Sequence, residues 1–378
     1  MKDKNKIVTV ISLLTCVIVF FGARFLLKPA HDASSAPSEY VEYDNGIVQE
    51  IFLDSCTEDP ISENSYRGEQ MLLVTVLTGQ YAAETLQVYN YVGPIYGIPL
   101  AKGDACTLAI STYADGTHRA TVYEYDRSKP LYIILGLFIL ATIVIGGMTG
   151  MKSLLGLFIT VASIFYLLFP ALLKGMPVIP SVFFMCVYVA MFSFILLGGV
   201  RKKTICAWLG TVAGMGFALL FSELCQYLLR IDGYRLSDVE ALLQMRQTGT
   251  PIGIKGLLSA GVIISSLGAV MDVAMSLSSA LQEIHEANPA LSRRRLFISG
   301  MNVGRDMVGT MTNTLILAYL GSGLVLTLYL YTLGLDIHQL LSSAYLSTEA
   351  TSSLAASIGI ILSVPLTTLI ASMFFAPK

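Results

Sequence analysis

The stretch GMNVGRDMVGTMTNTLILAYLG (300–321) carries polar side chains into an otherwise apolar segment. A helix turns about 100° per residue, so Asn302, Asp306 and Asn313 share one stripe, in line with Gly309. Carboxylate and amide oxygens suit a hard cation, and ionisable groups inside a membrane suit a proton relay. This stripe is the first candidate for an ion- or solute-binding site.

Two threonines and an arginine extend this candidate site. Thr310 adds a hydroxyl oxygen, while Arg305 and Thr312 flank the stripe. Arg305 would neutralise Asp306 or meet an anionic substrate, because a guanidinium pairs with carboxylates and other oxyanions. The residue types therefore leave both cations and anions open as substrates.

A second polar stripe lies on the preceding apolar segment, SLGAVMDVAMSLSSALQEI (266–284). Its members at helical spacing are Ser265, Asp272, Ser276, Ser279 and Glu283. A carboxylate near the bilayer midplane costs about 2.5 kcal/mol or more unless it is paired, protonated or hydrated. We expect Arg305 to be the partner of the Asp272 carboxylate, because consecutive segments usually pack together. We also expect this small-residue stripe to be a surface on which helices pack.

The composition predicts the elements that position these residues. The chain has 378 residues, of which 54% are hydrophobic and 13% charged. Soluble domains carry about 25% charged residues, so we expect a protein of the lipid bilayer. A transmembrane helix needs about 20 apolar residues. Such runs lie near 7–27, 131–150, 153–173, 178–200, 204–229, 256–281, 314–334 and 353–375, which predicts eight transmembrane helices.

Basic residues fall in every second connection between these runs. They are Lys2, Lys4, Lys6, Lys152, Arg201, Lys202, Lys203, Arg293, Arg294, Arg295 and Lys378. The positive-inside rule then places both termini in the cytoplasm and residues 30–129 outside. A cleaved signal peptide is the alternative for the first run. Arg24, and Pro37 after the best small-residue site at Ala36, favour an uncleaved anchor at residues 1–29.

Residues 30–129 have a different pattern, which begins with a linker at 31–40. Short alternating runs predict strands at 46–53, 70–77, 84–92, 105–112 and 119–126, with a hairpin turn at 114–116. Five short strands fit a small OB-like or SH3-like barrel, and a generic β-sandwich fragment is the alternative.

Cys56 and Cys106 both fall in this outer domain, where a disulfide is permitted, although two cysteines fix no connectivity. No metal-binding motif is present, and we expect no cofactor. A net charge of −2 without a basic cluster predicts no nucleic-acid partner.

The last third of the chain leaves two alternatives open. Residues 296–333 are too many for one span. Either 293–312 form a cytoplasmic helix, or the segment enters the membrane as a broken or re-entrant helix, with breaks at Gly300, Gly304 or Gly309.

In the last run, small residues predict close packing, and Pro365 predicts a kink. These small residues are Ser352, Ala356, Gly359 and Ser363, and Glu349 lies at the outer end.

Three runs, GAVMDVAMSLSSALQEI, EANPALSRRRLFISGMNVGRDMVGTMTNTLILAYLG and SIGIILSVPLT, closely resemble the YibE/F family of bacterial membrane proteins. The likeness extends to LTGQYAAETLQVYNYV and GDACTLAIS in the outer domain, where the family pattern has a glycine near Ala83. The matching site positions are Asp272, Glu283, Asn302, Arg305, Asp306, Thr310 and Asn313. The resemblance implies a multi-pass protein of the bacterial cytoplasmic membrane with a seven-helix bundle at 130–378. It implies no particular substrate or reaction.

The polar stripes, the predicted spans and the outer domain are consistent with three functions. The first is a transporter or channel-like permease that works by alternating access around the last three spans. The second is an assembly or sensor protein whose outer domain binds a partner or a cell-wall polymer. An enzyme comes third, since Asp272 and Asp306 would have to form an intramembrane aspartyl pair at matching depth. We therefore expect no enzymatic activity.

Overall fold

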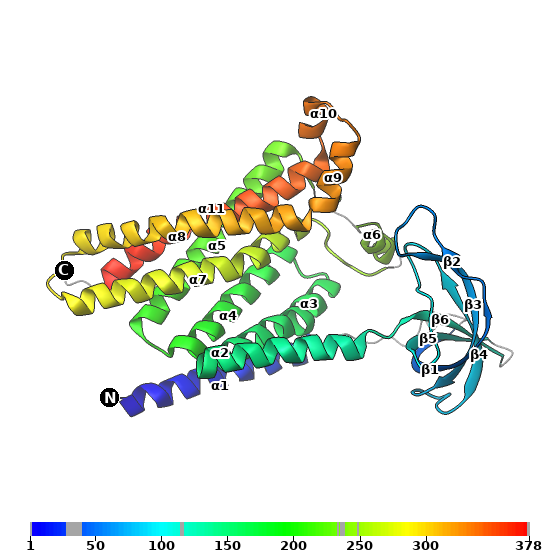
Figure 1. Cartoon of the computed structure of the whole chain (residues 1–378). Coiled ribbons are helices and arrows are strands. Elements are labelled where there is room, and N and C mark those ends of the chain that lie inside the picture. The colour runs from blue at the N-terminus through cyan, green and yellow to red at the C-terminus, as the bar shows by residue number, and fades with distance from the viewer. Residues whose placement is uncertain are drawn as a thin grey trace. The chain divides into compact units, whose positions relative to one another are not determined.

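The computed structural model describes residues 2–27, 40–113, 117–232, 234, 239–247 and 249–375. Contacts divide the chain into two compact units. One unit covers residues 30–144, and the other combines residues 1–29 with residues 145–378. We refer to the first as the outer unit, after the location that the sequence predicts for it, and to the second as the bundle unit (Figure 1).

The outer unit contains a small β-barrel. Its strands are β1 (Tyr40–Asp54), β2 (Thr57–Glu58), β3 (Tyr66–Val76), β4 (Thr85–Val92), β5 (Ala105–Thr112) and β6 (His118–Tyr125). The order is β1-β5-β6-β4-β3-β2, and an additional β1–β3 pairing closes five strands into a barrel. All pairings are antiparallel except that of β4 with β6, which is parallel at Tyr89 and Thr121.

The five predicted strands are confirmed as β1 and β3 to β6. The largest difference is in β1, which begins at Tyr40, six residues before the predicted start at Gly46. The first half of β1 pairs with β5, and its second half pairs with β3, so one long strand serves both neighbours. The predicted turn at 114–116 and most of the predicted linker, 31–39, lie outside the described residues.

Two amides lie inside the barrel among apolar side chains. Gln70 and Asn90 are each 1% exposed. The Gln70 amide donates to Asp54 Oδ2 (2.8 Å) and accepts from the Leu100 amide (2.8 Å), and Asn90 Nδ2 donates to Gln70 Oε1 (2.9 Å). Asn90 also donates to the Ile98 carbonyl (3.0 Å). These bonds hold the segment between β4 and β5 against the barrel.

The remaining described residues are helical apart from short connections. The helices are α1 (Lys2–Leu26), α2 (Ser128–Ser163), the π-helical η1 (Ile164–Leu168), α3 (Phe169–Leu173), α4 (Val178–Gly198), α5 (Lys202–Leu229), α6 (Val239–Gln247), α7 (Leu257–Ala287), α8 (Arg293–Ser322), α9 (Leu324–Thr332), α10 (Ile337–Leu341) and α11 (Ala344–Phe375). Figure 1 shows α5, α7, α8 and α11 side by side, and each packs against α11 or is α11 itself.

Within the described residues, five helical stretches are long and apolar enough to cross a membrane, which makes this chain a membrane protein. They are Ser128–Leu173, α4, α5, α7 and α11, and the bent pair α8–α9 would be a sixth. The apolar part of α1, Thr9–Phe25, is shorter and reaches only the lower limit for a span.

The predicted runs 131–150 and 153–173 form one 46-residue helical stretch, Ser128–Leu173. At 1.5 Å per residue this stretch would measure about 69 Å, more than twice the hydrocarbon thickness. The backbone breaks at Gly147, where φ is 54° and ψ is −137°. Glycine adopts this conformation readily because it lacks a Cβ atom.

The predicted break near Gly300, Gly304 or Gly309 is wrong. α8 is continuous from Arg293 to Ser322, and the chain bends by 63° only at the junction with α9. Two of these glycines instead allow neighbouring helices to approach. A Cβ on Gly300 would meet Leu281 at 2.9 Å, and one on Gly304 would collide with Val364.

Candidate functional site

Asp272 lies at the centre of α7. It is the sixteenth of the 31 residues of this helix, so fifteen residues separate it from either end. Val270, Val273 and Leu277 on the opposite side are fully buried, whereas Asp272 is exposed from the bundle. The side chain therefore lies halfway along an apolar helix and is not covered by the other helices of the bundle.

The predicted stripe on α7 has the predicted members but not the predicted role. Ser265, Gly268, Asp272, Ser276 and Glu283 are all exposed, and Ser279 is half-buried. The helix packs on α5 and α11 through its apolar side instead. The expectation that the small polar face is a packing seam is therefore wrong, because apolar side chains on the other side fill that contact.

The stripe on α8 also points away from the bundle. The buried residues of α8 are Leu296, Gly300 and Gly304, all toward the start of the helix. Asn302, Arg305, Asp306, Gly309, Thr310 and Asn313 are exposed. The two stripes therefore do not pack against each other. Thr310 donates to the carbonyls of its own helix at Asp306 and Met307 (3.2 Å each).

Two contacts fix the register between α7 and α8. Near one end of α7, the Ser265 and Tyr319 hydroxyls form a hydrogen bond. Near the other end, Leu281 lies against Gly300. The two helices are thus antiparallel. For two residues at the same level, one on α7 and one on α8, the residue numbers add up to between 581 and 584.

This register places Asp272 level with residues 309–312, which include Thr310 and Thr312. Arg305 lies four to seven residues, or roughly 6–10 Å, from that level. The predicted pairing of Asp272 with Arg305 is therefore wrong. The ion pairs among the described residues are Arg67–Asp59 and Arg127–Glu124, both in the outer unit. The hydroxyl oxygen of Thr312 is buried and has no hydrogen-bond partner.

A cavity of about 400 Å³ adjoins this region of α7. The wall residues on α7 include Ser265, Gly268 and Met271, the neighbour of Asp272. The opposite wall is formed by α2 after its break and by α4, with Lys152 at one end and Ser193 along the side. A Cβ on Gly268 would meet nothing within 4 Å, so the floor of this inner cavity is open.

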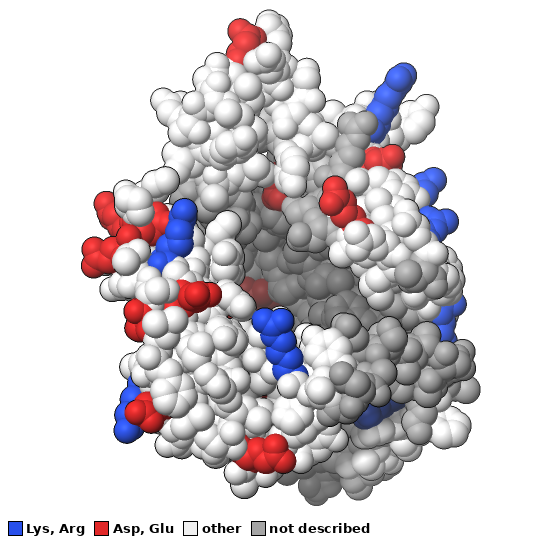
Figure 2. Space-filling model, turned by 90° about the vertical axis from the view of Figure 1, so that its right-hand side faces the viewer, with Lys and Arg blue, Asp and Glu red and all other residues white. Residues whose placement is uncertain are grey.

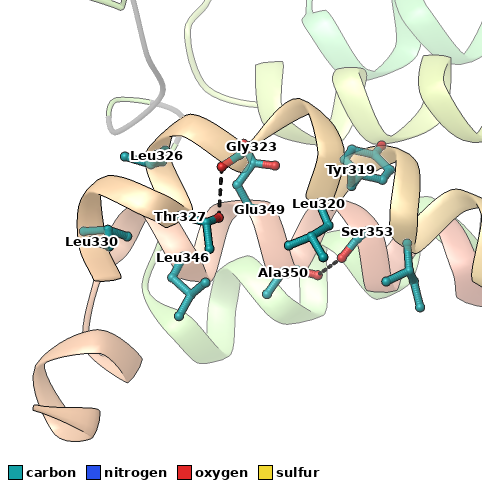
Figure 3. A pocket seen from close by; sticks show the side chains of 11 residues that line it. Tyr319, Leu320, Gly323, Leu326, Thr327, Leu330, Leu346, Glu349, Ala350 and Ser353 are labelled. Atoms are coloured by element: carbon teal, nitrogen blue, oxygen red, sulfur yellow. Dashed lines mark hydrogen bonds between the residues drawn. The ribbon is translucent and has the colours of Figure 1, made fainter. Parts of the chain in front are cut away.

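A second cavity, of about 200 Å³, lies where α8, α9 and α11 meet, and Figure 3 shows it. Glu349 from α11 and Tyr319 from α8 both line it, together with Thr327 and Ser353. Glu349 lies in the second turn of α11, and its carboxylate is exposed in this cavity, which we call the outer cavity.

The structure adds a polar cluster that the sequence analysis did not single out. Ser259 on α7 donates to the Glu223 carboxylate (2.5 Å), and Gln226 donates to Ser259 (2.5 Å). The Ser259 side chain is fully buried. The signal was present, because Glu223 is a carboxylate inside the predicted run 204–229. A charge near the start of α7 is also favoured by the helix dipole, so this cluster has a structural explanation.

The small face of α11 is a packing surface. Ala356, Gly359 and Ser363 are buried, and a Cβ on Gly359 would meet the Cβ of Ala218 at 2.8 Å. This confirms that small residues bring α5 and α11 together. α11 continues on both sides of Pro365.

Cys56 and Cys106 are free thiols, so the permitted disulfide does not form. Cys106 pairs with Gly46 in the barrel, whereas Cys56 follows Asp54 at the far end of β1, roughly 26 Å along the strand. A disulfide needs Cα atoms about 4.4–6.8 Å apart. Burial raises the pKa of the Cys106 thiol to about 12, and burial followed by the Asp54 carboxylate raises the pKa of Cys56 to about 11.

No cluster of three or more His, Cys, Asp or Glu side chains that could hold a metal ion occurs among the described residues. On the face shown in Figure 2, lysine and arginine side chains lie scattered among acidic ones. The described part of that face offers no continuous basic patch for a phosphate backbone.

The sequence model of the family described as YibE/F-like protein matches residues 134–377. That region covers most of α2 and every later helix, including both polar stripes, and it begins after the last strand of the barrel. No curated protein and no solved structure matches the chain. The match covers more than half of the sequence, and the chain therefore belongs to the YibE/F-like family.

Proposed function

We propose that this protein is a transporter or channel-like permease for an ion or small solute in the bacterial cytoplasmic membrane. One observation carries the proposal. Asp272 lies in the middle of a 31-residue apolar helix, exposed from its bundle and unpaired with any described residue. A charge at that depth is stable only if water, a proton or a ligand compensates it.

The surroundings of Asp272 support a water-filled path. The inner cavity reaches Ser265, Gly268 and Met271 on the same helix. A cavity of about 400 Å³ has room for several water molecules or a small solute, since one water occupies about 30 Å³ of liquid. Asn302, Arg305, Asp306, Thr310 and Asn313 extend the polar surface on α8, and Glu283 extends it on α7.

The topology is part of the proposal. We assign eight crossings, by counting α1, the two parts of Ser128–Leu173 on either side of Gly147, α4, α5, α7, α8–α9 and α11. Both termini are then cytoplasmic and the barrel is outside. Contacts of α1 with the bundle support an uncleaved anchor. The Tyr188 hydroxyl donates to the Cys16 carbonyl (3.0 Å), and Arg24 lies over the Tyr166 ring (4.3 Å).

The strand connectivity supports an OB-like identity for the barrel, because five strands close in a Greek-key order with one parallel contact. We propose neither an enzymatic reaction nor a nucleic-acid partner. Asp272 and Asp306 lie on stripes that do not face each other, so they do not form a dyad.

The experiment compares wild type with Asp272→Asn in detergent and in proteoliposomes. Purified protein is heated in the presence of inorganic cations, anions and small organic solutes. A ligand present at 100 times its Kd stabilises by about 2.7 kcal/mol, which a melting curve resolves. The proposal expects at least one ligand that stabilises wild type but not Asp272→Asn, with flux lost in the variant.

The matched control is Asp232→Asn, which removes an exposed carboxylate from the connection that follows α5. It should melt and transport as wild type does. Normal flux in a folded Asp272→Asn protein would refute the proposal.

A second candidate function is recognition of a partner by the barrel. Tyr43 and Tyr123 are 58% and 60% exposed, and their rings meet edge to face with centroids 5.0 Å apart. Exposed tyrosine pairs are common at interfaces because they bury large area with little loss of entropy. If the double change Tyr43→Ser and Tyr123→Ser abolished activity while Asp272→Asn kept it, this function would replace the first.

A further inference from the structure

One hydrogen bond connects the walls of the inner and outer cavities of the bundle unit. Tyr319 lines the outer cavity with Glu349, and Ser265 lines the inner cavity beside Gly268. The hydroxyls of Tyr319 and Ser265 are bonded to each other. This contact therefore joins a wall residue of one cavity on α8 to a wall residue of the other on α7.

We propose that the outer cavity is a binding site for a monovalent cation, and that the Ser265–Tyr319 hydrogen bond is the closed gate between this site and Asp272. The inference rests on the proposed transport function and names the class of ion that enters the path.

The chemistry of the outer cavity selects a cation. The Thr327 hydroxyl donates its proton to the Gly323 carbonyl (2.9 Å), and the Ser353 hydroxyl donates to the Ala350 carbonyl (3.2 Å). Figure 3 shows both bonds at the cavity wall. With their protons engaged, both hydroxyls offer only lone pairs to a ligand. Lone pairs and the Glu349 carboxylate bind hard cations and repel anions.

The charge of the site favours a monovalent ion. Glu349 is the one charged residue among those that line the cavity. Sites for divalent cations commonly use several carboxylates. The single negative charge of one carboxylate is instead neutralised by one monovalent cation, such as H⁺, Na⁺ or K⁺. The experiment below distinguishes these three ions.

The path beyond the gate continues on α7. Asp272 lies seven residues, about two turns, from Ser265 on the same exposed side. Gly268 stands between them with open space above it. On this exposed side of α7, the carboxylate of Asp272 is therefore the second one that follows after the gate, although Asp272 itself is not among the residues that line the inner cavity.

The test measures uptake of Na⁺, of K⁺ and of H⁺ separately, using full-length protein in proteoliposomes. Glu349→Gln should raise the half-saturating cation concentration by roughly ten-fold with an unchanged maximal rate, because one charge-assisted contact is lost. Tyr319→Phe keeps the ring but removes the hydrogen bond to Ser265 that forms the closed gate. This change should raise the maximal rate by roughly two- to ten-fold. Glu349→Asp, which keeps the charge, should stay within about three-fold of wild type.

Two matched controls carry the same chemical changes outside the path. Tyr329→Phe alters an exposed ring on α9 that does not line the cavity, and Glu286→Gln alters an exposed carboxylate at the far end of α7. Both should behave as wild type does.

The outcomes separate the two ideas. Wild-type kinetics in Glu349→Gln and Tyr319→Phe, with flux lost in Asp272→Asn, would overturn this inference and leave the transport function standing. Transport of a solute with no dependence on any cation would do the same. Equal loss of affinity in Glu349→Asp and Glu349→Gln would mean a structural role and would also overturn it. Absence of all flux from wild type would overturn both.

Discussion

Gly304 on α8 lies against Val364 on α11 so closely that no Cβ atom fits between them. Val364 is 1% exposed and belongs to the core formed by α7, α8 and α11. A second close contact between the same two helices, that of Gly300 with Thr368, acts with it to set how near α8 lies to α11.

Gly304→Ala should therefore destabilise the bundle by about 1–3 kcal/mol, because overpacking forces the two backbones apart. Gly309→Ala on the same helix is the control. A Cβ there meets nothing within 4 Å, and alanine favours a helix by up to about 1 kcal/mol over glycine. Opposite shifts in melting temperature are expected, and equal shifts would refute the packing explanation.

Gln70 is the centre of the polar network inside the barrel. Replacing it with leucine would leave Asn90 and the Leu100 amide without their bonds (2.9 and 2.8 Å), at a cost of about 1–3 kcal/mol for each unsatisfied group. Amide exchange in residues 93–104 should accelerate first. Gln87→Leu, at an exposed position of β4, is the control and should leave that exchange unchanged.

Ala83 occupies a backbone position that suits glycine. Its φ is 70°, a region in which a Cβ atom is crowded by the backbone. Ala83→Gly should stabilise the barrel by about 1 kcal/mol. The change removes the backbone strain, and the greater conformational entropy of glycine in the unfolded chain offsets part of that gain. Thermal melts of the full-length protein measure this gain. A loss of stability would show that the surrounding loop relieves the strain in another way.

Acid should weaken the barrel through Asp59. The Ile61 amide (2.8 Å), the Ser62 amide (3.1 Å) and Arg67 (2.9 Å) contact its carboxylate, and these contacts lower its pKa in that order. A lowered native pKa adds stability above the unfolded value of about 3.9, and this stability is lost as the pH falls through the native pKa. Melting temperatures measured from about pH 6 to about pH 3 should fall less in Asp59→Asn than in wild type. Parallel curves would exclude Asp59 as a source of the acid sensitivity.

Alternation predicted the barrel well because one face of each strand is buried. Leu72, Val74 and Val76 point inward at every second position of β3, as the apolar run 70–77 predicts. Gln70 also points inward, and residue type alone does not reveal that its partners are Asn90 and Leu100, which come from distant parts of the chain.

The polar stripes show a different limit. Helical spacing identified Asp272 and its line of serines, since spacing depends only on the turn of the helix. Which side of α7 packs depends on the neighbouring helices α5 and α11. The side that carries Val270 and Leu277 is the one that packs against them. The expected pairing with Arg305 failed because register is set by Ser265–Tyr319 and Leu281–Gly300, which the sequence does not disclose.

The length of α8 has a consequence for the lipid. Its 30 residues measure about 45 Å, while the hydrocarbon core measures about 30 Å. Ser292 caps the helix by accepting from the Arg295 amide (3.5 Å), so the arginine-rich first turn is helical and extends toward the headgroups. A helix that is longer than the hydrocarbon core is accommodated by tilting, by kinking or by local thickening of the bilayer, and its tilt is also set by packing on neighbouring helices. The depth of Asn302, Asp306 and Asn313 is thus determined by lipid chain length as well as by the protein.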